Sequence, residues 1–424
     1  MKKSILLLGG FLLTTTATAQ YKVEVDLGQY PVKEAYLYET NGSKEVIAQR
    51  QKAANGKITF NYPKNYAGMM KLYFPESNEA FNFITENQDV KVKLGSNNGK
   101  ISSIDYQDEP NRILAVVQDQ QRKKEQILPV LVQMVSFYNS DTDFGRAIRK
   151  EIDALNTTAA PDLSRYPFLN FYTNNYSKYA GKDQSLTRED FIKFFANSNS
   201  YLERSAIMRP ALMNYLSLSS EENMTQDIDK LLDAVSLESP RGQTILSELI
   251  DIFDMYGMDT YKDQYLAKAN SLTCTINDRL ASTIRSNKNV ALGSVLPNYT
   301  FNRAYNTKAK SIYDVKANKK LIMFWASICS HCEAELPKIM ENYKALKAAG
   351  TEVIGLSLDS DAVRFAERAQ MLPWINDSEL KGWNSSVSEL YNVRATPTYL
   401  ILDANNKIID KPRNFAQALA FLQK

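Results

Sequence analysis

The chain has 424 residues, of which 44% are hydrophobic, and a formal net charge of +3 from 51 basic and 48 acidic side chains. This length predicts two to three globular domains, and the composition excludes an intrinsically disordered chain. We find neither a basic cluster nor basic residues interleaved with aromatic ones, so the sequence argues against nucleic-acid binding and favours small molecules or proteins as partners.

Residues 1–19 have the features of an export signal. Lys2 and Lys3 precede an apolar segment from Ile5 to Leu13, and Ala17-Thr18-Ala19 forms an A-x-A cleavage site. The apolar segment is too short to span a bilayer of roughly 30 Å, and no later segment approaches about 18 uncharged apolar positions. We therefore expect a soluble mature protein that begins near Gln20, does not span the membrane and resides in the periplasm or cell envelope. The alternative for this segment is a buried core strand.

Short segments with strand periodicity occupy residues 20–103. Asn41-Gly42 and Asn55-Gly56 supply hairpin turns between them. Regular spacing of short strands with turn signals predicts a small β-sandwich-like domain. The expected strands are residues 21–27, 35–38, 57–60, 69–74, 80–84 and 89–94.

Helical periodicity characterises residues 104–290, which we expect to form an α-helical domain. Ser239-Pro240 predicts a helix start before an apolar stripe, and Thr187 with Asp190 predicts another. These stripes are typical of a packed core rather than of a cofactor site. Cys274, between apolar neighbours, is most simply a buried small residue, and a resolving role in disulfide exchange is its alternative.

Strands and helices alternate over residues 291–424, which predicts an α/β domain. Buried strands are expected at residues 321–325 and 353–358, and a hairpin of 398–402 with 407–409 is expected around Asn405-Asn406. The helix between the first two strands begins at Cys329-Ser330-His331-Cys332, so two of the three cysteines and the only histidine lie at its start.

Cys329 and Cys332 are three residues apart in the first turn of this helix, which is close enough for a reversible disulfide. Free N–H groups and the positive end of the helix dipole favour the thiolate of Cys329. Because a thiolate attacks disulfide sulfur through a mixed disulfide, Cys329 is the expected nucleophile and Cys332 the resolving cysteine. The pair itself is the redox group, a reversible Cys329–Cys332 disulfide, and we expect neither a metal nor a separate cofactor.

Two further features flank this pair. His331 adds partial positive charge beside Cys329 and should shift the pair toward oxidising power. Ser330 and Glu333, three residues apart, predict a capping box for the helix.

Other interpretations of the same residues stay open. A structural zinc site would need Cys329, His331, Cys332 and the distant Cys274 together, with no spare ligand. Covalent haem attachment requires a histidine directly after the second cysteine, where this chain has Glu333. A Cys-His hydrolase would have no separate base, and a reduced, idle pair would have no activity.

Residues 324–337, FWASICSHCEAELP, resemble the active-site segment of the thioredoxin superfamily, in particular of the exported TlpA/ResA-type thiol-disulfide oxidoreductases. The family signature is W-A-x-x-C-x-x-C-x-x-E-x-P. Downstream, YNVRATPTYLILDANNKII resembles the family segment in which a cis-proline faces the disulfide, here at Thr396-Pro397. The resemblance covers about residues 291–424, and a β-rich module and helical region before such a domain are known among exported bacterial proteins. The signature is matched by Trp325, Ala326, Cys329, Cys332, Glu335 and Pro337.

The resemblance implies an enzyme that exchanges disulfides with protein substrates, with the direction of electron flow open. It implies that Glu335 manages the proton of Cys332, whereas its other interpretation is a solvated helix carboxylate. The partners it implies are protein thiols and disulfides and a membrane electron-transfer protein. The surface it implies for substrate binding consists of Trp325, Ile328, Thr396 and Pro397.

The sequence also departs from the family pattern. Met323 replaces the buried aspartate of thioredoxins proper, Ile328 replaces an aromatic residue, and His331 replaces proline. Peroxidases need threonine three positions before the reactive cysteine, where this chain has Ala326. The alternative from another class is a partner-binding envelope protein, in which the β-rich and helical regions recognise a partner and the thioredoxin fold is accessory.

Overall fold

The structure is a computed structural model that describes residues 21–157, 161–181 and 185–424. The expected export signal at residues 1–19 lies outside the described residues. Within the described ranges no helix combines the length and apolar character needed to cross a membrane. These residues form two compact units, one of residues 21–37, 47–72 and 82–171 and one of 38–46, 73–81 and 172–424.

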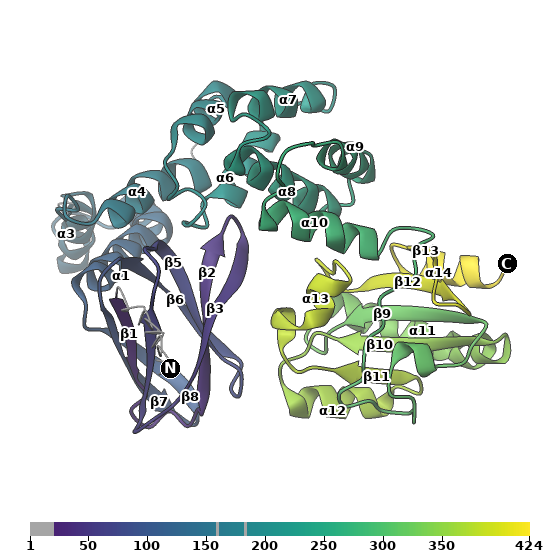
Figure 1. Cartoon of the computed structure of the whole chain (residues 1–424). Coiled ribbons are helices and arrows are strands. Elements are labelled where there is room, and N and C mark those ends of the chain that lie inside the picture. The colour runs from purple at the N-terminus through teal and green to yellow at the C-terminus, as the bar shows by residue number, and fades with distance from the viewer. Residues whose placement is uncertain (1–20, 158–160, 182–184) are drawn as a thin grey trace, which may run out of the picture. The chain divides into compact units, whose positions relative to one another are not determined.

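The N-terminal region is β-rich, as the sequence predicts (Figure 1). Its strands form two four-stranded sheets with the orders β4-β1-β7-β8 and β3-β2-β5-β6. At the expected hairpin turns, Gly42, Asn55 and Gly56 have φ of 66°, 52° and 73°, in the left-handed region that glycine and asparagine tolerate. The strands are β1 Tyr21–Asp26, β2 Glu34–Asn41, β3 Lys44–Lys52, β4 Lys57–Tyr62, β5 Ala67–Phe74, β6 Glu79–Glu86, β7 Val90–Asn97 and β8 Lys100–Tyr106.

The helical region follows directly, and its expected helix starts are confirmed. Thr187 and Asp190 form a capping box, and the Ser239 side chain accepts a hydrogen bond from the Gly242 N–H. The helices are α1 Glu109–Arg122, η1 Lys123–Ile127, α2 Leu128–Val135, α3 Asp143–Thr157, α4 Pro167–Asn175, η2 Tyr176–Ala180, α5 Arg188–Asn197, α6 Met208–Ser217, α7 Met224–Ala234, α8 Pro240–Met255, α9 Asp259–Asn270 and α10 Asp278–Asn289.

The C-terminal region contains a five-stranded sheet with the order β11-β10-β9-β12-β13 (Figure 1). The first three strands are parallel, and β12 and β13 are antiparallel to their neighbours. Its elements are η3 Ile312–Asp314, β9 Lys319–Trp325, α11 Ser330–Ala348, β10 Thr351–Ser357, α12 Ala362–Met371, β11 Ile375–Ser378, η4 Gly382–Asn384, α13 Ser386–Leu390, β12 Thr398–Asp403, β13 Ile408–Asp410 and α14 Phe415–Leu422.

Both faces of this sheet are buried, which explains why β9 is apolar from Leu321 to Trp325, after its first two residues Lys319 and Lys320. Alternate residues of β9 enter different cores: Leu321 and Met323 pack with α11, α12 and α14, whereas Ile322 and Phe324 pack with α13 and residues 290–315. Antiparallel pairing places Thr398, the first residue of β12, opposite Phe324, near the end of β9. The segment before β12 therefore comes to the sheet edge at which β9 leads into α11.

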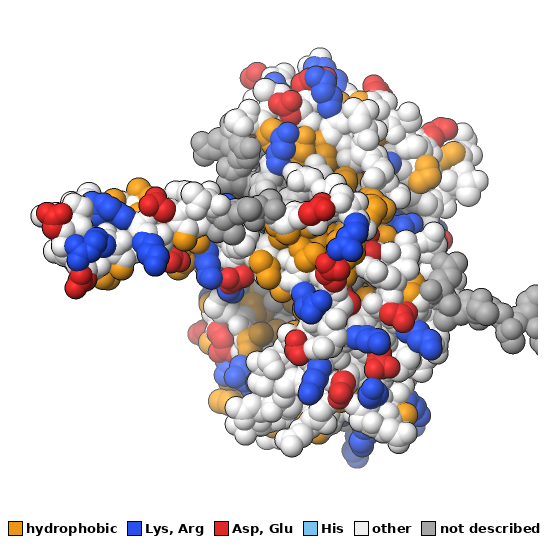
Figure 2. Space-filling model, turned by 90° about the vertical axis from the view of Figure 1, so that its left-hand side faces the viewer, with side chains coloured by type: hydrophobic (Ala, Val, Ile, Leu, Met, Phe, Trp, Pro, Cys, Tyr) orange, Lys and Arg blue, Asp and Glu red, His pale blue; other side chains and the backbone are white. Residues whose placement is uncertain are grey.

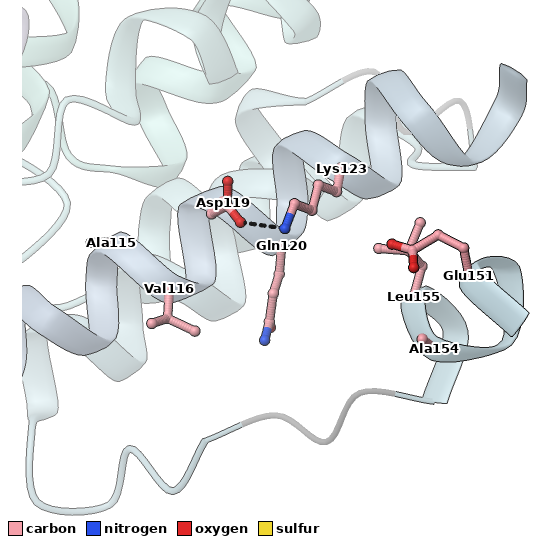
Figure 3. A pocket seen from close by; sticks show the side chains of 8 residues that line it. All are labelled: Ala115, Val116, Asp119, Gln120, Lys123, Glu151, Ala154 and Leu155. Atoms are coloured by element: carbon pink, nitrogen blue, oxygen red, sulfur yellow. Dashed lines mark ion pairs between the residues drawn. The ribbon is translucent and has the colours of Figure 1, made fainter. Parts of the chain in front are cut away.

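The helices after β8 carry exposed apolar side chains. Phe137 is 84% exposed, and Figure 2, which views the side on which α3 lies in Figure 1, shows hydrophobic side chains among charged ones. A cavity of about 460 Å³ lies between α1, η1 and α3 (Figure 3). Lys123 and Asp119 form an ion pair of 2.9 Å at this cavity. All three cysteines belong to the other unit, and none of them lines this cavity.

Candidate active site

Cys329 is the N-cap residue of α11. Its backbone is extended, with φ of −88° and ψ of 111°, and its Sγ accepts a hydrogen bond from the N–H of Cys332 at 3.2 Å. The expected capping box of Ser330 and Glu333 is therefore wrong, because the sulfur takes the capping position and Glu333 forms an ion pair with Arg368. The nucleophilic atom thus lies where helix N–H groups can stabilise a negative charge.

The surroundings of Cys329 favour its thiolate. Cys329 is half-buried, and its thiol donates to the carbonyl oxygen of Thr396 at 3.3 Å. Burial acts against the charged form, but hydrogen bonds from Cys332, from the Thr396 side chain and from the His331 N–H outweigh it and lower the pKa of Cys329. His331 itself is exposed.

Cys332 lies one turn inside the same helix and has the opposite character. It is fully buried in the core that α11 forms with the sheet, and both cysteines are free thiols. Burial, together with the hydrogen bond and negative charge of Cys329, raises the pKa of Cys332 to about 12. One sulfur is accessible and ionises readily, while its neighbour is shielded and keeps its proton.

Thr396-Pro397 is a cis peptide bond, as the family resemblance implies. The Thr396 carbonyl faces the Cys329 sulfur, so this loop forms one side of the site. On the other side Ile328 is 75% exposed directly before Cys329. Three of the four residues expected at the substrate-binding surface, Ile328, Thr396 and Pro397, are thus accessible at the site.

Trp325 differs from that expectation. Its side chain has no exposed surface, and its ring lies 6.3 Å from the Phe365 ring, centroid to centroid, within the core. The assignment of Trp325 to the substrate-contacting surface is therefore wrong, because the residue alternates to the inner face of β9 with Leu321 and Met323. Its ring is part of the core of the domain.

Asp359 holds that loop, and the sequence analysis missed it. Its carboxylate accepts two hydrogen bonds from the Ser327 N–H at 3.0 Å, one from the Ser327 hydroxyl at 2.7 Å and one from the Ser357 hydroxyl at 2.7 Å. Asp359 directly follows the expected strand at residues 353–358, at the carboxyl end of a parallel strand. That position was the available signal, because such strand ends gather at one edge of the sheet.

Glu335 lies on the next turn of α11 after Cys332. Its carboxylate accepts from the Phe415 N–H at 2.6 Å, from the Tyr399 hydroxyl at 3.3 Å and from the Lys338 ammonium at 2.8 Å. Burial alone would raise the pKa of Glu335, but these hydrogen bonds lower it. Glu335 is therefore a partly buried, ionised acid rather than a solvated one.

Cys274 lies just before α10 and is half-exposed, not buried as expected. Its sulfur accepts a hydrogen bond from the Gln243 side-chain amide at 3.4 Å.

The mixed sheet, the helix that begins at Cys329 and the cis-proline beside the sulfur together define a thioredoxin-like domain with a dithiol site. Comparison with known proteins agrees. The model of the AhpC/TSA family matches residues 292–411.

Curated relatives of this domain are thiol-disulfide oxidoreductases named ResA. The protein from Geobacillus kaustophilus is 26% identical over 123 residues, which cover 28% of this chain and 67% of that protein. The protein from Bacillus subtilis is 21% identical over 139 residues, which cover 32% of this chain and 76% of that protein. The C-terminal domain is thus a thioredoxin-like domain that is similar to thiol-disulfide oxidoreductases, and the similarity supports oxidoreductase activity.

Solved structures are similar to parts of this chain. The thioredoxin domain of a thiol-disulfide oxidoreductase from Bacteroides vulgatus is 25% identical, covers 31% of this chain and 96% of its own, and has a TM-score of 0.29. A thioredoxin-like protein from Bacteroides caccae is 15% identical, covers 57% of this chain and 95% of its own, and has a TM-score of 0.35.

Proposed function

We propose that this protein exchanges disulfides with protein substrates in the cell envelope through Cys329 and Cys332. The observation that supports this most is the placement of two neighbouring thiols, of which Cys329 is accessible at the N-cap of α11 and Cys332 is fully buried one turn inside the helix. Cys329, at the helix N-cap, has a lowered pKa, and the buried Cys332 has a raised one. A thiol that ionises readily suits the attacking nucleophile. A buried thiol that keeps its proton suits the resolving cysteine, which reacts only after the mixed disulfide has formed.

The exchange has two steps. The Cys329 thiolate attacks one sulfur of a substrate disulfide, a mixed disulfide forms, and the other substrate sulfur leaves as a thiolate that takes up a proton. Cys332 then loses its proton and attacks the Cys329 sulfur, which releases the second substrate thiol. The substrate gains two electrons, and the protein is left with a Cys329–Cys332 disulfide; the reverse sequence oxidises a substrate dithiol.

Two neighbouring groups would assist these steps. The accessible backbone at Thr396 would pair with an extended substrate segment and bring its sulfur to Cys329. Cys332 must be deprotonated for the second step. Glu335 is a partly buried carboxylate on the next turn of α11 that accepts from the Tyr399 hydroxyl, and it would take up the proton of the buried thiol.

The location and the electron partner are part of this proposal. The export signal expected at residues 1–19 would place the protein in the periplasm or cell envelope. A membrane electron-transfer protein would then restore the starting redox state of the dithiol after each turnover. Such a partner would exchange thiols with Cys329 in the way a substrate does.

Single replacements of the two cysteines test the proposal. In an insulin-reduction assay Cys329→Ser should abolish turnover, because no thiolate remains to attack. Cys332→Ser should accumulate mixed disulfides with the substrate, visible by non-reducing electrophoresis. If both variants are as active as the parent, the proposal fails.

Partner binding is the second candidate, and the exposed apolar side chains after β8 favour it. A protein partner would cover residues such as Val130, Val132 and Phe137. This function predicts that a purified partner binds with unchanged affinity after both thiols are alkylated. Loss of binding upon alkylation would instead assign the interaction to the dithiol site.

A further inference from the structure

The segment that leads into the cis-proline loop is held by α8 and α10, which belong to the same compact unit. This segment, residues 389–394, begins in α13 and ends two residues before Thr396. Its contacts with the two helices are Ser282 Oγ to Glu389 Oε1 at 2.8 Å, Asn289 Nδ2 to Leu390 O at 3.0 Å, Asn392 Nδ2 to Asp254 Oδ2 at 2.6 Å, and Arg394 Nη2 to Asp251 Oδ1 at 3.1 Å.

The helix side of these contacts is rigid because Asp251 is part of a buried ionic cluster. The Asp251 side chain is 1% exposed and also accepts from Arg279 at 2.6 Å and from Arg209 at 3.4 Å. Glu248, one turn earlier in α8, accepts from the same two arginines at 2.9 Å and 2.8 Å. Arg394 thus binds a carboxylate whose position is fixed by other partners.

The loop side is also constrained. Asn392 is buried and has φ of 51°, a left-handed conformation that asparagine tolerates better than most residues. Its side chain accepts from Ser286 at 3.3 Å and donates to Asn287 at 3.4 Å, besides its bond to Asp254. The chain therefore turns toward Thr396 at a residue whose side chain is held by α8 and α10.

Only Ala395 separates Arg394 from Thr396, whose carbonyl accepts the hydrogen bond from the Cys329 sulfur. Two residues of chain span at most about 7 Å, so a displacement of Arg394 is transmitted to Thr396. We infer that Asp251 and Asp254 are positioning residues for disulfide exchange, because they fix the cis-proline loop against Cys329 from the helical region. This inference rests on the proposed function and assigns the helical region a part in it.

The competing explanation is that these contacts only join two parts of the unit. The chain offers a matched control for it. Arg413, before α14, forms an ion pair with Asp259 of α9 at 2.8 Å, and both side chains are more than half exposed, at 66% and 54%. This pair links the same helical region to the thioredoxin-like domain but does not involve residues 389–396. If joining is the only role, loss of either arginine should affect stability alone and leave the KM for substrate and the reactivity of Cys329 unchanged.

The experiment compares full-length Arg394→Gln and Arg413→Gln in the insulin-reduction assay. Arg394→Gln leaves Asp251 paired with Arg279 and Arg209, so the variant should fold. We expect its KM for insulin to rise about tenfold at a nearly unchanged kcat, because a displaced loop misplaces the substrate strand. Arg394→Lys, which keeps the positive charge, should recover part of the loss, and Arg413→Gln should stay within about twofold of the parent.

A second measurement separates positioning from a loss of folded protein. The pH at which Cys329 is half-maximally alkylated by iodoacetamide should rise in Arg394→Gln, because the hydrogen bond from the Thr396 side chain helps to stabilise the thiolate, and should not move in Arg413→Gln. Equal KM values and equal alkylation midpoints in the two variants would overturn the inference. If the proposed function itself is wrong, the result is different, because Cys329→Ser will then keep full activity.

Discussion

The dithiol site and the ionic cluster of α8 both contain groups with strongly shifted pKa values, yet only one of them is suited to chemistry. In the cluster, Glu248 and Asp251 are buried and paired with buried or mostly buried arginines. At the dithiol site, Cys329 is half-exposed and its charge is stabilised mainly by hydrogen bonds. A shifted pKa therefore indicates function here only when the shifted group can be reached by a substrate.

Replacement of Arg279 in the ionic cluster should mainly lower stability, whereas replacement of Cys329 at the dithiol site should mainly abolish activity. Arg279→Met leaves Glu248 and Asp251 buried with fewer partners, and we expect a loss of about 3–5 kcal/mol in the free energy of unfolding. Cys329→Ser should change it by less than about 1 kcal/mol, because serine is a good N-cap residue, although turnover is lost. Urea unfolding of both variants measures the difference. Equal destabilisation would contradict the contrast between the regions.

Acid should weaken the ionic cluster through its carboxylates. Burial alone would raise the pKa of Glu248, but Arg279, Arg209 and the Ser43 hydrogen bonds lower it to about 2. A carboxylate with a lowered folded pKa stabilises the protein above its unfolded pKa of about 4.5, and this contribution is lost as the pH falls toward 2. The shift corresponds to about 3 kcal/mol.

The measurement is urea unfolding at several pH values between 5 and 2.5. The free energy of unfolding should fall over this range, and Glu248→Gln should reduce the slope. Asp119→Asn removes an exposed ion-paired carboxylate and serves as the control, with a smaller effect on the slope. A slope that Glu248→Gln leaves unchanged would show that Glu248 is not the group that titrates.

The reactive segment could be predicted because its signals are local in sequence. We could predict the helix start and the nucleophile from the order of Trp325, Cys329, Cys332 and Pro337. Thr396-Pro397, later in the chain, predicted the loop on the opposite side of the site. The two cores of the C-terminal sheet also followed from continuous apolar strands. Local patterns were sufficient here because the same cysteines and prolines indicate both where a structural element begins and what chemistry the site can perform.

Elements with polar sequences were missed for a physical reason. β3 and β8 are edge strands of their sheets with mostly exposed or half-exposed side chains, so neither shows an apolar alternation, and β8 extends the β-rich region three residues past the expected boundary at 103. β11 is buried but polar, and its Asp377 is satisfied by Tyr299 and by the N–H groups of Asn302 and Arg303. Burial of polar residues depends on partners that are distant in sequence.

The same limit applies to the supporting residues of the site. Tyr399 reaches Glu335 across 64 residues, and Arg394 reaches Asp251 across 143. No local pattern indicates such pairs, and the helical region therefore gave no sequence signal for its contact with the cis-proline segment. The burial of Trp325 was recoverable in principle, from its alternation with Leu321 and Met323.

The pH dependence of thiol alkylation tests the central claim most directly. With iodoacetamide and peptide mass analysis, Cys329 should reach half-maximal alkylation below the pH of an ordinary cysteine, about 8.5, and its rate should then stay level as the pH rises. Cys332 should stay unmodified over this range in the folded protein and react after unfolding in urea. Half-maximal alkylation of Cys329 at or above 8.5, or modification of Cys332 first, would contradict the account.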